Sequence, residues 1–130
     1  MKEREAILST LRNLALDRAA VAMMREDIAR VEEDAKRKEL PAVQREALKK
    51  ESVKLQSRLV ATVNHIRSVE RLLELLSPEE QKVIDRTLIN PTVNAVFDLV
   101  EELHCETASV YRIRARAISK LVRLRYGARE

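Results

Sequence analysis

The sequence contains very few of the residues that turn a chain or crosslink it. Among 130 residues there are one Gly, three Pro and one Cys, and aromatic residues make up 2%. Such a shortage of turn residues argues against a strand-rich fold, and the single Cys105 excludes an internal disulfide and a thiolate zinc cluster. One glycine also excludes a Gly-rich phosphate loop. With 35% charged residues, the composition is typical of long helices.

Long apolar segments are missing as well. No run reaches the roughly 18 apolar residues that a transmembrane helix requires. The opening residues, Met-Lys-Glu-Arg-Glu, lack the apolar stretch of a signal peptide. The sequence therefore predicts a cytoplasmic protein without a membrane span.

Catalytic and metal-binding constellations are not found in the sequence either. His104 and Cys105 are neighbours, and the only other histidine is His65. We expect His104 and Cys105 to be turn residues, with Cys105 packed inward, because a metal site would need distant ligands. Ser109 has no histidine and acid placed to activate it. The sequence predicts no enzyme, no cofactor and no metal.

Negative charge is nearly absent from the C-terminal segment. From Thr107 onward there are seven basic residues and one acidic residue, Glu130, whereas residues 1–106 hold 18 basic and 20 acidic residues. The net charges are therefore +6 and −2. A solvated charged face usually mixes both signs, so this concentration predicts a polyanionic partner. The seven cations are Arg112, Arg114, Arg116, Lys120, Arg123, Arg125 and Arg129.

The first 76 residues follow a helical apolar pattern. We expect one helix over residues 2–38 and a second from about Pro41 to Leu76, separated at Leu40-Pro41. The short connection favours an antiparallel hairpin or coiled coil that forms a homodimer, and the alternative is core packing of a small bundle. The seam positions are Ile7, Leu14, Val21, Ile28 and Ala35, then Leu48, Leu55, Leu59, Ile66, Val69, Leu73 and Leu76; Ser52 and Thr62 occupy two seam positions of the second helix.

Residues 77–130 predict a helix-turn-helix domain. Ser77, Pro78 and Glu80 form a capping box that starts a helix, which stops near Ile89 before the Asn90-Pro91 turn. The next helix is expected to be capped by Thr92, to carry Val93, Val96, Phe97, Val100 and Leu103, and to end at a tight turn over residues 104–106. A last helix over residues 107–126 ends at Gly127. Val110 and Ile113 should pack back onto Leu99 and Val100.

The last helix separates into an inward and an outward face on a helical wheel. Val110, Ile113, Ala117, Leu121 and Leu124 are predicted inward; Ala108, Arg112, Ala115, Arg116, Ser119 and Arg123 are predicted outward. Arginine pairs well with guanine edges or phosphates. We assign base contact to Arg112 first and Arg116 second, and phosphate contact to Arg114 and Arg125. The full set of candidate DNA-binding residues is Thr107, Ala108, Ser109, Tyr111, Arg112, Arg114, Arg116, Ser119, Lys120, Arg123 and Arg125.

The last 52 residues or so resemble sigma-70 region 4-like helix-turn-helix domains. The segments "LSPEEQKVIDRTL", "VFDLVEELHCETASVYRIRARAISKL" and "RLRYG" look like the small phage and prophage transcription regulators of the ArpU and RinA type. The chain departs from that pattern at His104, where glycine is usual, at Val100, where a small residue is usual, and at Glu106, where a Ser or Thr cap is usual. The resemblance implies promoter DNA as the ligand and RNA polymerase as a candidate partner.

The fold and function expected from the sequence follow from these patterns. We expect an all-α chain, with a helical hairpin over residues 1–76 that oligomerises or contacts a partner, and a DNA-binding domain over residues 77–130. The expected function is that of a DNA-binding transcription regulator of phage or prophage type. Two alternatives are a DNA-recognition protein like a phage small terminase subunit, which usually has the reverse domain order, and a structural coiled-coil protein.

Overall fold

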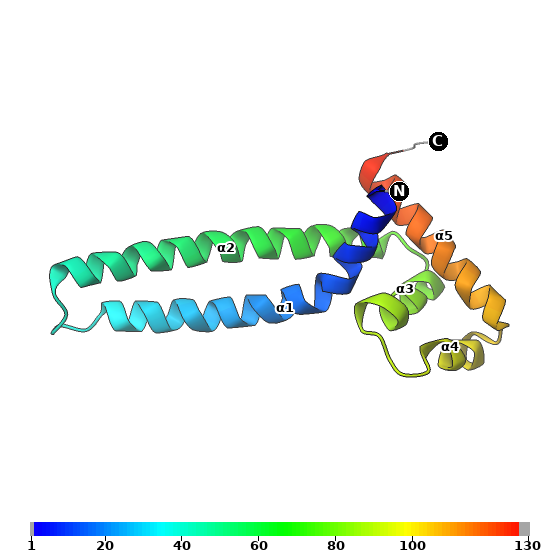
Figure 1. Ribbon diagram of the computed structural model, residues 1–130, viewed down its shortest axis with the longest axis horizontal. Coiled ribbons are helices and arrows are strands. Elements are labelled where there is room, and N and C mark those ends of the chain that lie inside the picture. Colours follow the sequence, from blue (N-terminus) through cyan, green and yellow to red (C-terminus); the bar gives the residue numbers. More distant parts are fainter. Residues whose placement is uncertain (1, 128–130) are drawn as a thin grey trace. The chain divides into compact units, whose positions relative to one another are not determined.

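The computed structural model describes residues 2–127, and every regular element in that range is helical (Figure 1). The elements are α1 (Lys2–Ala35), α2 (Ala42–Glu74), α3 (Pro78–Ile84), the π-helical η1 (Asp85–Ile89), α4 (Ala95–Leu103) and α5 (Thr107–Tyr126). The predicted all-α class is confirmed. Among these helices none is long and apolar enough to cross a membrane. Arg129 and Glu130, both part of the charged C-terminal segment, lie outside the described residues.

The chain divides into two compact units whose boundary differs from the one expected at residue 76. Residues 16–67 form one unit, called here the hairpin unit. Of the other described residues, 2–15 and 68–127 form the second unit, called here the discontinuous unit. The start of α1 belongs with the C-terminal helices because Ile7 and Leu11 are buried beside Val69 and Leu121.

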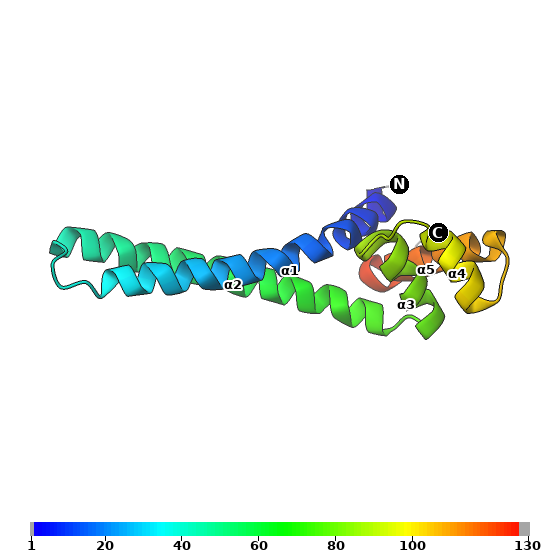
Figure 2. The same cartoon turned by 90° about the horizontal axis from the view of Figure 1, so that it is seen from below.

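The hairpin unit consists of antiparallel stretches of α1 and α2 that lie side by side (Figures 1 and 2). Its seam contains polar pairs that fix which residues face each other. The hydroxyl of Ser52, 7% exposed, donates to Oε1 of Glu32 at 3.3 Å, and Nε2 of Gln56 donates to the same oxygen at 3.0 Å. His65 and Asp17 approach to 3.7 Å further along. Ser52 at the seam therefore joins α2 to α1 through the carboxylate of Glu32.

The predicted capping box lies at the start of α3, in the discontinuous unit. The hydroxyl of Ser77 accepts the N–H of Glu80 at 3.1 Å, and Oε1 of Glu80 accepts the N–H of Ser77 at 2.8 Å. Pro78 occupies the first helical position. The helix then widens into η1, where the hydroxyl of Thr87 donates to the carbonyl of Val83 at 2.7 Å. This helical run ends at Ile89, where the sequence predicted its end.

Helix α4 begins later than the sequence predicted, which changes its apolar face. Its N-terminal cap is Asn94 in a left-handed conformation, φ 62°, and not Thr92. Val93 consequently lies in the turn and is 87% exposed, and Phe97 is 63% exposed. The predicted cap at Thr92 and the placement of Val93 on this helix are therefore wrong. The four half-buried or buried residues of α4 that pack inward are Val96, Leu99, Val100 and Leu103.

The core between α4 and α5 follows the predicted contacts. Val83, Leu99, Val110 and Ile113 form one buried cluster, and Val100 and Cys105 pack against it. Two side-chain ion pairs of Glu102 tie α4 to the preceding helices, one to Arg86 at 2.6 Å and one to Lys82 at 3.3 Å. The predicted inward packing of Cys105 is confirmed, and the helix-turn-helix frame is built on this cluster.

Candidate nucleic-acid interface

The turn between α4 and α5 depends on one residue with a positive φ. His104 is the C-terminal cap of α4, with φ 51° and ψ 48°, and the N–H of Cys105 then donates to the carbonyl of Val100 at 3.2 Å. Glycine adopts this left-handed conformation most easily, whereas a residue with a Cβ does so at a cost. His104 thus supplies the turn that a glycine usually supplies. The next helix starts at Thr107, and the Glu106 side chain makes no capping hydrogen bond to the described residues.

The buried face of α5 is rotated slightly from the predicted one. Val110, Ile113, Ala117 and Leu121 are buried as expected. Ile118, which the helical wheel did not place inward, is fully buried, and Leu124, which it did, is 43% exposed. Helix α5 packs against α3 and α4 and, at Leu121, against Ile7 and Leu11 at the start of α1, a neighbour that lies far away in sequence.

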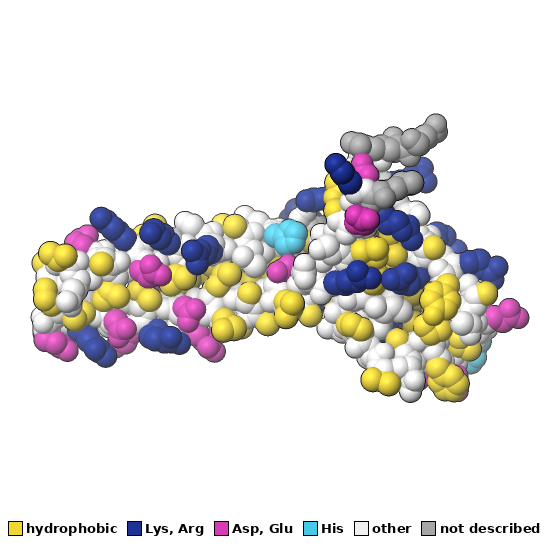
Figure 3. Space-filling model, in the orientation of Figure 1, with side chains coloured by type: hydrophobic (Ala, Val, Ile, Leu, Met, Phe, Trp, Pro, Cys, Tyr) yellow, Lys and Arg dark blue, Asp and Glu magenta, His cyan; other side chains and the backbone are white. Residues whose placement is uncertain are grey.

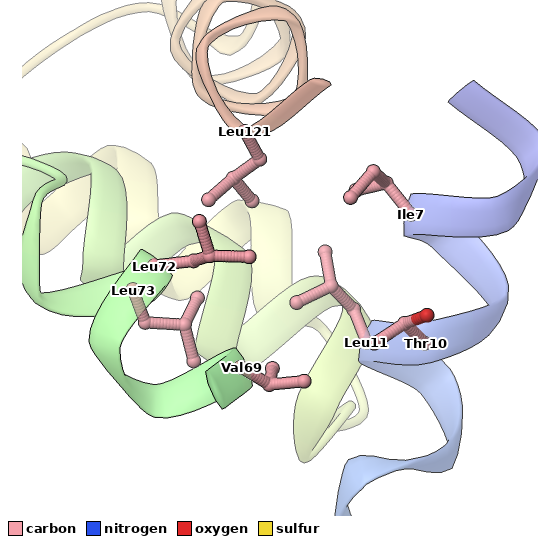
Figure 4. Close-up of a pocket in the computed structure, with 7 residues that line it drawn as sticks. All are labelled: Ile7, Thr10, Leu11, Val69, Leu72, Leu73 and Leu121. Carbon is pink, nitrogen blue, oxygen red and sulfur yellow. The ribbon is translucent and has the colours of Figure 1, made fainter. Parts of the chain in front are cut away.

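The start of α1 contacts α5 through a small apolar cluster (Figure 4). Ile7 and Leu11 point toward Leu121 across a cavity of about 10 Å³, whose other wall is formed by α2 residues. A cavity of this size holds no ligand, so the contact is ordinary close packing. The α2 residues on that wall are Val69, Leu72 and Leu73. These contacts hold the C-terminal part of α5, around Leu121, against α1 and α2.

The face of α5 opposite the core is exposed and free of acids. Its exposed members are Ala108, Arg112, Ala115, Ser119 and Arg123, all predicted outward. Nη2 of Arg112 donates to the hydroxyl of Ser109 at 3.0 Å, one turn earlier on the helix. Figure 3 shows Lys and Arg side chains over α5, whereas the two signs alternate over the hairpin unit. We call these five residues the outer stripe.

Arg116 and Lys120 differ from the outer stripe because both bind an acid. Nε of Arg116 lies 3.3 Å from Oε2 of Glu80, and Nζ of Lys120 lies 3.1 Å from Oε1. The helical wheel predicts Arg116 on the outward stripe; its side chain is 62% exposed, but it lies on the flank next to α3. The Glu80 side chain is 2% exposed. Two of the seven predicted cations therefore share one buried counter-charge.

The carboxylate of Glu80 has a strongly perturbed pKa. Burial by itself raises this pKa, but hydrogen bonds from the Ser77 N–H, Lys120, the Ser77 hydroxyl and Arg116 outweigh burial and lower it from 4.5 to about 2. These bonds stabilise the ionised form. Glu80 is therefore charged at neutral pH, and it joins the cap of α3 to α5. The sequence identified the cap but not the ion pairs, because the partners lie 36 and 40 residues away.

The remaining predicted residues lie on the other flank and at the start of α5. Nη1 of Arg125 donates to the hydroxyl of Ser68 at 3.2 Å. Tyr111 is 54% exposed, and Thr107 is exposed at the first position of the helix. Arg114 is half-buried and, with Tyr111 and Phe97, lines an open groove of about 630 Å³. The eleven predicted residues thus share one helix but face three directions.

Comparisons with known proteins give no match: no protein-family model, curated protein or solved structure is similar to this chain. Within residues 2–127, no group of three His, Cys, Asp or Glu side chains is placed to hold a metal ion. The interface is consequently assigned from its own geometry and charge.

Proposed function

We propose that this protein is a DNA-binding transcription regulator of phage or prophage type, with α5 as a recognition helix in the major groove. The observation that carries this proposal is the outer stripe: α5 is held by its opposite face and offers 20 residues without an acid. The major groove admits an α-helix, and its base edges offer the acceptors that arginine pairs with.

The outer stripe supplies the groups that could read bases. Arg112 stands near its centre, and its guanidinium can pair with O6 and N7 of guanine. Ala108 and Ala115 on the same stripe are small, which lets the backbone of α5 approach the groove closely. Arg116 is the second residue proposed to contact bases, because Glu80 binds its Nε and fixes the direction of the guanidinium.

The flanks of α5 supply groups for the sugar-phosphate backbone. Arg114 and Arg125 on one flank and Lys120 on the other are suited to phosphates, which set the register of the protein on the duplex. The hydroxyl groups of Thr107, Ser109 and Tyr111 can add neutral contacts of the same kind. Ser119 and Arg123 extend the outer stripe toward the C-terminal end.

The hairpin unit is proposed to act as the oligomerisation arm of a homodimer. A dimer would present two copies of α5 to two half-sites, which is how many helix-turn-helix proteins increase their specificity. RNA polymerase is a candidate partner, on the basis of the sigma-70 region 4 resemblance alone. A cytoplasmic location belongs to the same proposal.

Fluorescence anisotropy with labelled duplex DNA tests the function. If about six phosphates are neutralised, affinity for random and genomic fragments should fall by about 10³ between 50 and 200 mM salt. Arg58→Ala, an exposed arginine of α2, is the matched control for Arg112→Ala and should bind as the wild type does. Absence of binding at the low-salt end on both kinds of DNA would refute the proposal and favour the structural coiled-coil alternative.

Sequencing of the genomic fragments that the protein binds then distinguishes the proposed transcription regulator from the small-terminase alternative. Enrichment of promoter sequences is expected for a regulator. Enrichment of a single packaging-type site next to terminase genes would instead support the small-terminase alternative. The gene neighbourhood gives the same distinction.

A further inference from the structure

Three arginines from two distant parts of the chain meet on the flank of α5 that faces α1. Arg114 lies on α5, and the charges of Arg12 and Arg4 of α1 act on it. Burial, followed by repulsion from Arg12 and Arg4, lowers the pKa of Arg114. No ion pair joins any of the three to a carboxylate within residues 2–127. We call Arg4, Arg12 and Arg114 the arginine cluster.

Apolar packing brings the arginine cluster together. Arg4 precedes buried Ile7 by three positions and Arg12 follows buried Leu11 directly, so both border the face of α1 that contacts α5. Arg114 lies two turns before Leu121, on the same side of α5. Because Ile7, Leu11 and Leu121 pack together (Figure 4), the start of α1 that carries Arg4 and Arg12 stays against the helix that carries Arg114.

The opposite flank of α5 shows what a structural role for such cations looks like. There Arg116 and Lys120 surround the buried carboxylate of Glu80. Among the described residues no such acid pairs with the arginine cluster, so its charge is left for an external anion. The groove beside Arg114 adds Thr92 and Tyr111, whose hydroxyl groups are frequent phosphate ligands.

We propose that the arginine cluster binds the phosphates of the DNA backbone beside the groove that α5 enters, so that Arg4 and Arg12 at the start of α1 are DNA contacts. The inference rests on the proposed DNA-binding function. It adds α1 to an interface that otherwise belongs to α5 alone.

The test compares two charge-matched double variants of the full chain. Arg4→Gln/Arg12→Gln should lower the slope of log affinity against log salt by about two, since each lost phosphate contact removes about 0.9. The loss of affinity should be equal on a selected site and on scrambled DNA. Arg58→Gln/Arg67→Gln removes two exposed charges from α2 and should leave the slope unchanged.

Several outcomes separate this inference from the proposed function. If the wild type does not bind duplex DNA, the function itself fails. If the wild type binds and Arg112→Ala weakens binding, but Arg4→Gln/Arg12→Gln binds like the wild type, only the arginine cluster is refuted. Equal slope changes in both double variants would also overturn the inference, because they would report net charge and not a site.

Thermal unfolding supplies a second readout. Removing like charges should leave the midpoint of Arg4→Gln/Arg12→Gln equal to or above that of the wild type, whereas a lower midpoint would indicate a structural role and count against the proposal. Inorganic phosphate and chloride at equal ionic strength should give the wild type the same midpoint. A midpoint raised by phosphate in the wild type, and not in the double variant, would assign the site to free phosphate and overturn the DNA assignment.

Discussion

Nζ of Lys120 lies 3.1 Å from Oε1 of Glu80, so an ammonium near the middle of α5 binds the residue that caps α3. The same oxygen accepts the N–H of Ser77 at 2.8 Å. The carboxylate of Glu80 therefore stabilises the start of α3 and also binds α5, the proposed recognition helix, to α3. Loss of this charge should affect the folding of the discontinuous unit and the position of α5 together.

Glu80→Gln should destabilise the protein by about 2 kcal/mol, because Arg116 and Lys120 lose a buried counter-charge while the shape of the side chain is kept. Urea unfolding followed by circular dichroism measures this. Glu79→Gln, the exposed neighbour in the same first turn, should change the stability by less than about 0.5 kcal/mol. Equal effects of the two substitutions would contradict the role of Glu80.

Acid should remove the contribution of Glu80 over a defined window. Its pKa is lowered from 4.5 to about 2 in the folded protein, so the unfolded chain takes up this proton first as pH falls. The stabilisation is complete above pH 4.5 and declines as pH falls toward about 2. The free energies of unfolding of wild type and Glu80→Gln should therefore converge in this window. If the difference in the free energy of unfolding between wild type and Glu80→Gln stays constant down to the acid end of this window, the charge of Glu80 is not the source of the stabilisation.

His104→Gly should stabilise the protein by up to about 1 kcal/mol, because glycine adopts the left-handed conformation of this turn without the strain of a Cβ. His65→Gly is a matched control in the interior of α2 and should have the opposite sign, with a loss of about 1 kcal/mol. Thermal or urea unfolding compares the two. A loss of stability in His104→Gly would mean that the imidazole makes a contact that outweighs the strain.

Arg112→Ala should cost about 1–3 kcal/mol of binding free energy on a selected site and should relax the base preference there. Arg125→Ala should weaken all sequences about equally and lower the salt slope by about one. Both variants should remain folded, since both side chains are exposed. Titrations on selected and scrambled DNA measure the contrast. If Arg112→Ala weakens both DNAs equally, the recognition helix is rotated and Tyr111 or Thr107 becomes the reader.

Leu59→Asp should disrupt the hairpin unit and the proposed homodimer, since Leu59 is half-buried in α2 and a carboxylate there would have to be desolvated. Val60→Asp, at the exposed neighbouring position, should be tolerated. Light scattering should give the wild type a mass of two chains at micromolar concentration. A mass of one chain would refute the dimer.

Features that depend on neighbouring residues could be predicted from the sequence. The capping box at Ser77 and Glu80 was located correctly, and so were the turn before Thr107 and the end of α5 at Gly127. Each is encoded by residues within one helical turn of one another. The ends of the long helices were displaced by only a few residues, because helix termini fray and are weakly encoded.

Features that depend on distant residues could not be predicted. Glu80 was recognised as a cap, but nothing in its neighbourhood indicates Arg116 or Lys120. The contact of Leu121 with Ile7 and Leu11 was missed because the start of α1 was expected to lie in a separate hairpin. Thr92 was predicted as the cap of the next helix, but the left-handed cap at Asn94 starts α4 two residues later than Thr92 would.

The discontinuous unit has a practical meaning for fragments of this protein. A fragment that starts at Ser77 would contain the complete helix-turn-helix motif, yet it would uncover Leu121 by removing Ile7 and Leu11, each of which contributes about 1.5–3 kcal/mol when fully buried. In this sense residues 16–67 are an insertion into a smaller helical domain. The minimal autonomous fragment would keep residues 2–15 and rejoin them to residue 68 through a short designed loop.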